Sequence, residues 1–200
     1  EIDMNSKLWN EMKNNIVLNN SSTFDKDGMI TGGNSIDRAM MSLVNSDEYK
    51  NIHKNIQMLD KQVFSSSNKY SAFTTKDNLT YYKGAPERII EKCSYMIDED
   101  GNRKSFTSKD KEAIQNKLRE MTTKSMRCIA LSSKNEKLEE NKLPDDMSLL
   151  GIIGVVDPVR DEVPDAVKIA HKAGIQVIEI TGDCIETAIA VAKIGRASCR

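Results

Sequence analysis

Four residues spread along the chain have side chains that could hold an aromatic ring and an anion: Phe64, Lys69, Lys83 and Arg127. Phe64 ends a predicted strand beside a polar turn, where one face of its ring can stay exposed for stacking. Lys83 lies between an apolar strand and a Gly-Ala-Pro turn, which limits its freedom and aims it into a pocket. The guanidinium of Arg127 has the shape to bind two phosphate oxygens at once.

Each of these residues also has a simpler interpretation. A lone Phe such as Phe64 is usually part of the core, and most lysines only solvate a surface. Arg127 could form a salt bridge at the start of a strand. Asp37 could merely favour the start of a helix, one turn after Asn34. The residue types alone leave both interpretations open.

A second set of polar residues follows predicted strands near the end of the chain. The strand 151–156 ends at Asp157, with Arg160 close behind, and the strand 175–180 ends at Thr181-Gly182-Asp183. Active sites in parallel sheets lie at the carboxyl ends of strands. The plain alternative is that Asp157 forms a turn and that Asp183 caps the following helix.

The composition indicates a soluble globular chain and gives no sign of binding to nucleic acid or to a membrane surface. The 200 residues suffice for one domain and part of another, and the net charge is only −1. Any small anion must therefore be bound by a few well-placed cations. The four cysteines form no C-x-x-C pair and lie far from both histidines, so we expect no metal site or disulfide framework and a reducing cytosol.

The two ends of the chain indicate an excised fragment rather than a whole gene product. The longest apolar run, 149–156, is too short to span a bilayer, and residues 1–20 lack the apolar stretch of a secretory signal. The chain starts at Glu1, and residues 196–200 carry no periodic pattern, as in a vector-derived tail.

Residues 1 to about 147 show mixed helix and strand patterns. Apolar spacing and turn residues predict helices and strands in turn. The predicted helices cover 34–44, 51–59, 86–93 and 109–124, and the predicted strands cover 61–64, 70–75, 79–83 and 127–132. Thr107 and Asp110 can form a capping box for the last helix.

From about residue 149 the chain is apolar, with strands and helices in alternation. The predicted order is a strand over 151–156, a helix over 164–173 that ends at Gly174, a strand over 175–180 and a helix over 185–194. Such an order predicts parallel strands joined by right-handed crossovers.

Five short stretches, which follow one another along the chain in the family's order, resemble the P-type ATPase family in its calcium-pump branch. The most specific are Lys83-Gly84-Ala85-Pro86-Glu87 and the combination of Asp157-Pro158-Val159-Arg160 with Thr181-Gly182-Asp183. The remaining three are Gly32-Gly33-Asn34-Ser35-Ile36-Asp37-Arg38-Ala39, Phe64-Ser65 with Lys69, and Met126-Arg127-Cys128-Ile129-Ala130. Family members often have Pro-Thr or Ala-Thr where this chain has Ser35-Ile36.

The resemblance implies a nucleotide-binding role for the first set of residues. Phe64 would stack on adenine, Asp37 would border the adenine pocket, and Lys83 would line it. Lys69 would lie near the base or the phosphates, Arg127 would contact the phosphates, and Gly84 would let the backbone approach the ligand.

For the second set, the resemblance implies a role in phosphoryl transfer. Thr181, Gly182 and Asp183 would lie beside the phosphorylation site, where their hydroxyl and amide groups meet the phosphoryl group. Asp157 and Arg160 would form a hinge that contacts the nucleotide region when the domains close.

The resemblance also implies the architecture. Residues 1–156 would form an α+β nucleotide-binding domain with a twisted, mostly antiparallel sheet. Residues 157–195 would be part of an α/β, haloacid-dehalogenase-like (Rossmann-like) phosphorylation domain. The parent would be a multi-pass membrane protein with this part on the cytoplasmic side, working with its other domains and membrane helices.

The implied reaction of the parent is ATP hydrolysis coupled to cation transport, most simply of Ca²⁺. ATP and Mg²⁺ would be used, and an aspartyl-phosphate would form. The acceptor motif Asp-Lys-Thr-Gly-Thr and the magnesium motif Gly-Asp-Gly-x-Asn-Asp are absent from the chain. We therefore expect the acceptor upstream of Glu1, and a fragment that binds ATP without turning it over.

Two other functions remain compatible with the pattern. One is a soluble haloacid-dehalogenase-type phosphatase with a large cap domain, although Lys83-Gly84-Ala85-Pro86-Glu87 argues against it. The other is a non-catalytic nucleotide-sensing module. The chain has no G-x-x-x-x-G-K-[ST] and no G-x-G-x-x-G, so a P-loop enzyme and a dinucleotide-binding fold are unsupported.

Overall fold

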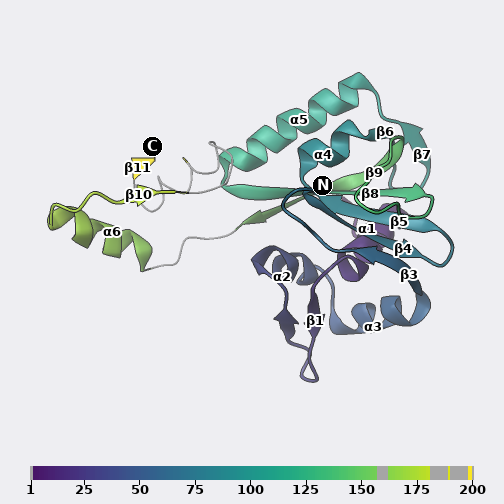
Figure 1. Cartoon of the computed structure of the whole chain (residues 1–200), viewed down its shortest axis with the longest axis horizontal. Coiled ribbons are helices and arrows are strands. Elements are labelled where there is room, and N and C mark those ends of the chain that lie inside the picture. Colours follow the sequence, from purple (N-terminus) through teal and green to yellow (C-terminus); the bar gives the residue numbers. More distant parts are fainter. Residues whose placement is uncertain (1, 157–161, 181–188, 190–197, 200) are drawn as a thin grey trace. The chain divides into compact units, whose positions relative to one another are not determined.

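The computed structural model describes residues 2–156, 162–180, 189 and 198–199 of the chain (Figure 1). These residues divide into two compact units. The first contains Glu1–Glu112 and Ile129–Ile153, and the second contains Ala113–Cys128 and Gly154–Arg200.

The first unit is built on a seven-stranded sheet with the order β3-β4-β5-β8-β9-β6-β7. The pairs β3–β4, β4–β5, β5–β8 and β6–β7 are antiparallel, while β6 and β9 are parallel. This mixed, mostly antiparallel sheet with helices confirms the predicted α+β class. The strands are β3 (Met58–Gln62), β4 (Tyr70–Thr75), β5 (Leu79–Gly84), β6 (Cys93–Ile97), β7 (Arg103–Ser105), β8 (Met126–Asn135) and β9 (Met147–Val156).

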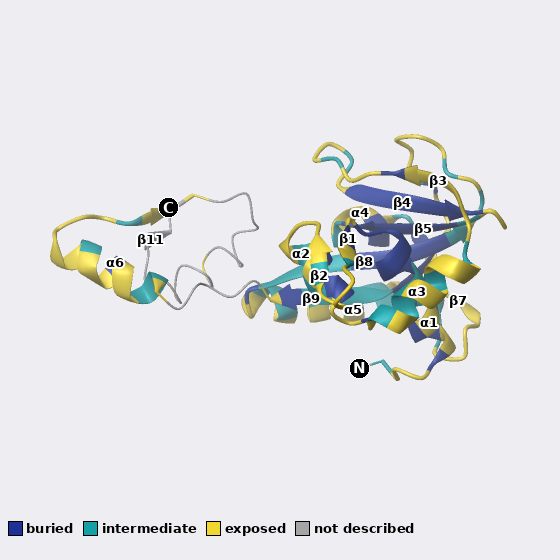
Figure 2. Ribbon diagram, turned by 90° about the horizontal axis from the view of Figure 1, so that it is seen from below, coloured by how far each residue is buried: buried dark blue, intermediate teal, exposed yellow. Residues whose placement is uncertain are grey.

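The neighbouring strands β4 and β5, second and third in the sheet, are buried on both faces because helices cover the sheet on both sides (Figure 2). In Figure 1, α2 and α3 lie on one face of the sheet and α4 lies on the other. The helices that begin in this unit are α1 (Lys7–Leu18), α2 (Ser35–Met41), α3 (Ser46–Asn55), α4 (Pro86–Glu91) and α5 (Ser108–Thr123), and a separate hairpin joins β1 (Ser22–Phe24) to β2 (Ile30–Gly32).

Helix α1 was not predicted, and it supplies much of the core. Ser6 caps its start by accepting a hydrogen bond from the backbone N–H of Trp9. Its buried face carries Trp9, Met12 and Ile16, at the spacing of one helical stripe. Asn15 lies on the same buried face, which disguises the apolar stripe in the sequence.

Several predicted elements are confirmed with small shifts at their ends. The predicted β4–β5 hairpin has the expected tip, with Asn78 in a left-handed conformation that suits Asn. The start of α5 has the predicted capping box between Thr107 and Asp110. The helix predicted over 51–59 is confirmed only in its first part: α3 ends at Asn55, and the chain then extends into the edge strand β3.

The N-terminal capping box of α3 sets where this helix begins, and pairing of the following residues with β4 sets where it ends. Asn45 and Glu48 form a capping box that fixes the start of the helix ahead of the predicted range. After Ile56 the backbone pairs with β4, beginning at Met58 opposite Thr75. Pairing with a neighbouring strand overrides the weak local preference for helix.

In the second unit, α6 (Val163–Lys172) matches the helix predicted over 164–173, and Gly174 follows it with a positive φ. The strand predicted over 175–180 is reduced to β10 (Ile178–Glu179), which pairs in parallel with β11 (Ser198–Cys199). The helix predicted over 185–194 lies outside the described residues, apart from position 189. The haloacid-dehalogenase-like assignment and the domain boundary after residue 156 stay predictions.

Candidate nucleotide-binding site

A buried ion pair joins Asp37 on α2 to Lys83 on β5. The Lys83 ammonium donates a hydrogen bond to Asp37 Oδ1 over 2.8 Å. Asp37 is 7% exposed and Lys83 is 9% exposed. Asn34 caps α2 and accepts a hydrogen bond from the Asp37 backbone N–H over 2.8 Å, so the helix start holds the carboxylate in place. Two predicted site residues 46 positions apart in sequence are thus in direct contact.

The surroundings of Lys83 act on its charge in opposite directions. Burial is the largest influence and lowers the pKa of Lys83 below that of a free lysine. The Asp37 carboxylate raises the pKa again through its charge and its hydrogen bond, while the nearby cation Lys61 lowers it. Lys83 is therefore a cation held in a largely dry environment, where its attraction for an anion is little screened by water.

Glycine is needed at position 84 because the backbone at the start of the neighbouring strand β4 passes close to it. A Cβ at this position would lie 2.5 Å from the Lys69 carbonyl oxygen and 2.6 Å from the Tyr70 Cβ. The same Lys69 carbonyl accepts the Ala85 backbone N–H over 2.9 Å. The structure therefore brings the predicted residues Lys69 and Gly84 together at the end of the β4–β5 hairpin.

The loop between β3 and β4 presents the predicted aromatic ring and a second lysine to solvent. Phe64 is 61% exposed, and the following turn closes when the Lys69 backbone N–H donates to the Ser65 carbonyl over 2.8 Å. Lys69 has φ 58, and its ammonium lies 3.8 Å from the Glu87 carboxylate. Phe64 is not a core residue, so its ring is available for stacking on a ligand.

The other predicted site residues are not joined to this group by the described contacts. Arg127 is half-buried near the start of β8 and belongs to the second unit. Asp157, Arg160, Thr181, Gly182 and Asp183 lie outside the described residues. The group that the structure assembles is Asp37, Lys69, Lys83 and Gly84, with Phe64 at the start of the same turn.

Sequence reasoning missed two residues that contact this group. Asn20, just after α1, donates its amide N–H to the Asp37 carbonyl over 3.1 Å. Lys61 on β3 donates to the Asn20 carbonyl over 3.3 Å and is close enough to lower the pKa of both Lys83 and His53. Neither residue belongs to a recognisable motif, because their roles depend on elements that meet only in the folded chain.

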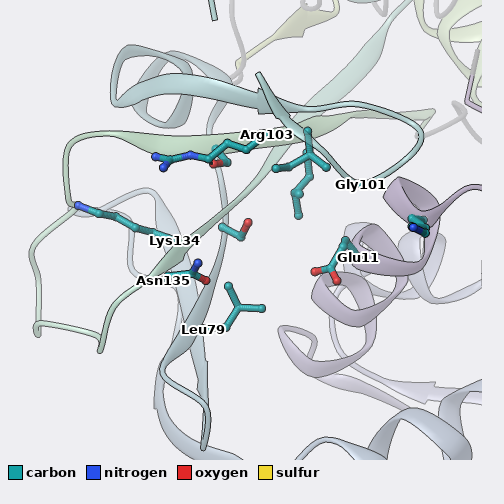
Figure 3. A pocket seen from close by; sticks show the side chains of 11 residues that line it. Glu11, Leu79, Gly101, Arg103, Lys134 and Asn135 are labelled. Atoms are coloured by element: carbon teal, nitrogen blue, oxygen red, sulfur yellow. The ribbon is translucent and has the colours of Figure 1, made fainter. Parts of the chain in front are cut away.

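A pocket of about 460 Å³ in the first unit lies among other residues and contains none of the predicted site residues (Figure 3). Arg103 and Lys134 line it across from Glu11 (Figure 3). These two cations are already engaged, because they donate to the carbonyl oxygens of Asp146 and Asp145 over 3.1 and 2.7 Å. The pocket cations thus hold a turn together, and we assign no ligand to it.

Two negative findings hold for the part of the chain that the structure describes. Within it, no three His, Cys, Asp or Glu side chains gather in a way that could hold a metal ion. Within the same residues, no helix is both long and apolar enough to cross a bilayer.

Comparison with known proteins bears on what this group of residues does. Residues 8–162 match the family described as "P-type ATPase, cytoplasmic domain N". Calcium-transporting ATPase 1 of Schizosaccharomyces pombe is 30% identical over 186 residues, which is 88% of this chain and 20% of that relative. The putative plasma membrane-type calcium-transporting ATPase 13 of Arabidopsis thaliana is 38% identical over 125 residues, which is 62% of this chain and 12% of that relative.

The similarity extends to a bacterial protein. The calcium-transporting ATPase of Bacillus subtilis is 29% identical over 188 residues, which is 88% of this chain. The chain spans only 12%, 20% and 21% of the length of these three relatives. Because the family match includes the residues of the Asp37–Lys83 pair, the structural group and the similarity lie in the same segment. The chain therefore belongs to the P-type ATPase family as its cytoplasmic domain N, of the kind found in calcium-transporting ATPases.

Proposed function

We propose that this chain is the ATP-binding cytoplasmic part of a P-type ATPase that couples ATP hydrolysis to the transport of a cation, Ca²⁺. The observation that carries the proposal is the buried Asp37–Lys83 pair beside Gly84. A lysine held in a largely dry environment offers a fixed positive charge that water screens little, and Gly84 lets the strand that carries this lysine pack closely against Lys69.

In this proposal each residue of the group acts on a different part of ATP. Phe64 stacks on the adenine ring, for which its exposure is suited. Asp37 borders the adenine pocket and Lys83 lines it, while Lys69 lies near the adenine base or the phosphates. Arg127 contacts the phosphates through its guanidinium.

The rest of the reaction is assigned to the parent protein. The γ-phosphoryl group passes to an aspartate outside this chain, largely through positioning and charge stabilisation. Thr181, Gly182 and Asp183 lie beside that aspartate, and Asp157 and Arg160 act at the hinge between residues 1–156 and the partial phosphorylation domain 157–195. The parent is a multi-pass membrane protein that holds this part on the cytoplasmic side.

Mg²⁺ enters this proposal together with the phosphates of ATP. Its ligands are mostly outside this chain, because the 200 residues contain no Gly-Asp-Gly-x-Asn-Asp, the family's magnesium motif. The 200 residues contain no Asp-Lys-Thr-Gly-Thr. We therefore expect this chain to bind ATP and to leave it unhydrolysed.

The test is a titration of the ¹⁵N-labelled chain with ATP, and separately with inorganic phosphate, followed by backbone amide shifts. ATP should shift the amides around Phe64, Lys69, Lys83 and Arg127, and these shifts should shrink in Phe64→Ala. Val63→Ala is the matched control, because Val63 is 72% exposed and lies next to Phe64. If ATP leaves those four amides in place, the nucleotide assignment is wrong.

The same titration, together with the gene sequence on either side of this chain, separates the proposal from its two alternatives. A haloacid-dehalogenase-type phosphatase would respond to phosphate near Thr181-Gly182-Asp183 and would need no contact with adenine. A non-catalytic nucleotide-sensing module would bind ATP but would have no partner domains for phosphoryl transfer. The gene sequence on either side of this chain distinguishes the sensor, since membrane segments on both sides indicate a pump.

A further inference from the structure

Asn20 has a buried side-chain amide, both of whose polar atoms have partners, at the junction between α1 and β1. It is 9% exposed. Its amide nitrogen donates to the Asp37 carbonyl over 3.1 Å, and its amide oxygen accepts the Ser22 backbone N–H over 2.8 Å. Its own carbonyl accepts from the Lys61 ammonium over 3.3 Å. One residue thus joins the end of α1 to β1, α2 and β3.

The orientation of this amide follows from its neighbours. The Ser22 N–H can only donate and the Asp37 carbonyl can only accept, so the oxygen must face Ser22 and the nitrogen must face Asp37. A side chain with the wrong atom at either end would leave a buried polar group unsatisfied, which typically destabilises by about 1–3 kcal/mol. Position 20 therefore requires a side chain with one acceptor, for the Ser22 N–H, and one donor, for the Asp37 carbonyl, and Asn supplies both.

Three polar groups of Asp37 each form a hydrogen bond with a different residue. Its N–H donates to the Asn34 side chain, its carbonyl accepts from Asn20, and its carboxylate accepts from Lys83. The first of these contacts is internal to the start of α2. The contact with Asn20 is the one among these three that ties the Asp37 backbone to a part of the chain outside α2.

We propose that Asn20 is a positioning residue for the nucleotide site: by fixing the Asp37 backbone, it sets where the Asp37 carboxylate holds the Lys83 ammonium. Asn20 itself touches no ligand in this scheme. The inference rests on the proposed function for its link to ATP, but the link between Asn20 and Lys83 stands on geometry alone.

Two substitutions separate the contacts of Asn20. Asn20→Leu keeps the volume and removes both side-chain hydrogen bonds. Asn20→Asp keeps the acceptor for the Ser22 N–H and replaces the donor to Asp37, but it also adds a negative charge. Asn20→Leu adds no charge and is therefore the deciding variant. The matched control is Asn15→Leu, since Asn15 is a fully buried asparagine whose amide donates to the carbonyls of Tyr82 and Ser132 instead.

Three measurements are made on each folded variant: the midpoint of thermal unfolding, the ATP dissociation constant by calorimetry, and the pH titration of the Lys83 Cε resonance. That resonance is assigned by its loss in Lys83→Met. Both Asn20 variants should raise the ATP dissociation constant roughly 3- to 10-fold and shift the Lys83 titration. Asn15→Leu should lower the unfolding midpoint without either effect.

A further arm tests whether Asn20 acts through Lys83. In a Lys83→Met background, Asn20→Leu should weaken ATP binding no further, because the group that Asn20 positions is gone. The inference is overturned if both Asn20 variants lose thermal stability while the Lys83 titration stays unchanged. If the unsubstituted chain fails to bind ATP, the proposed function fails, and the Lys83 titration still decides the role of Asn20.

Discussion

Two neighbouring parts of the candidate site are built in opposite ways. The buried cluster of Asn20, Asp37 and Lys83 keeps its polar groups out of water and satisfies them with one another. The exposed turn, residues 64–69, leaves its aromatic ring and its lysine in solvent. The buried cluster is therefore tied to the stability of the fold, whereas the exposed turn can act on a ligand with little effect on folding.

Because of this difference, substitutions in the two parts should change different quantities. Breaking a buried ion pair leaves one charge uncompensated, and the loss appears in the free energy of unfolding. An exposed side chain contributes little to that free energy, so its loss appears in ligand affinity. The comparison fails if stability and affinity change together in both parts.

The largest effect is expected from Asp37→Ala, which leaves the Lys83 ammonium buried without its counter-charge. The free energy of unfolding should fall by about 3–5 kcal/mol, measured by urea denaturation. The double variant Asp37→Ala/Lys83→Met should lose less than the sum of the two single variants, because it leaves no unpaired charge. A loss below about 1 kcal/mol in Asp37→Ala would mean that the pair behaves as an exposed one.

Gly84→Ala tests the contact at which the two parts meet. The added Cβ would lie 2.5 Å from the Lys69 carbonyl oxygen, and a strand backbone cannot easily move away. We expect a loss of about 1–3 kcal/mol in the free energy of unfolding. Gly154→Ala is the control, since a Cβ there would also meet an atom at 2.5 Å, but that atom is the flexible methyl end of Met121. Equal losses in the two variants would contradict the rigid contact.

Phe64→Ala tests the exposed turn, where affinity and stability should separate. Loss of the ring should weaken ATP binding by about 1–3 kcal/mol, measured by calorimetry. The free energy of unfolding should stay within about 0.5 kcal/mol of the unsubstituted value, since Phe64 is exposed. If unfolding is strongly affected while ATP affinity is not, Phe64 is a packing residue.

The exposed turn was largely predictable from sequence, because its signals are local. The polar run after Phe64 and the tight turn at Gly84 are each visible within a few residues of chain. The strand predicted over 61–64 ends earlier, at Gln62, so Phe64 lies in the loop after β3. The β4–β5 hairpin, at whose end Lys69 and Gly84 meet, was predicted from alternation and turn residues. Local patterns of this kind survive folding because few distant contacts compete with them.

The buried cluster could be predicted only in part. Asp37 and Lys83 were named separately, but their ion pair joins two elements whose approach no local pattern encodes. Asn20 follows α1, a helix that was missed because the polar Asn15 interrupts its apolar stripe. The helix wrongly extended over 51–59 has the same kind of cause, since pairing with β4 fixes β3. Contacts between distant segments decided each of these cases.

The smallest effect is expected from Lys61→Met, which changes the charge around the buried cluster without removing any member of it. The Lys61 cation lowers the pKa of Lys83, so its removal should raise that pKa toward the ordinary value of 10.5. The measurement is the pH titration of the Lys83 Cε resonance. Lys50→Met, at an exposed position on α3, is the control.

The same change should appear in the pH dependence of stability. With the pKa of Lys83 lowered by folding, the unfolded chain binds more protons between that lowered value and 10.5, so stability rises with pH across this window. Raising the pKa of Lys83 in the folded chain moves the lower limit of this pH window upward. The stability of Lys61→Met should therefore rise less with pH. If stability rises with pH as steeply as before and the Lys83 resonance does not move, the charge of Lys61 does not act on the buried cluster. The buried cluster would then be electrostatically independent of β3, the strand that leads into the exposed turn.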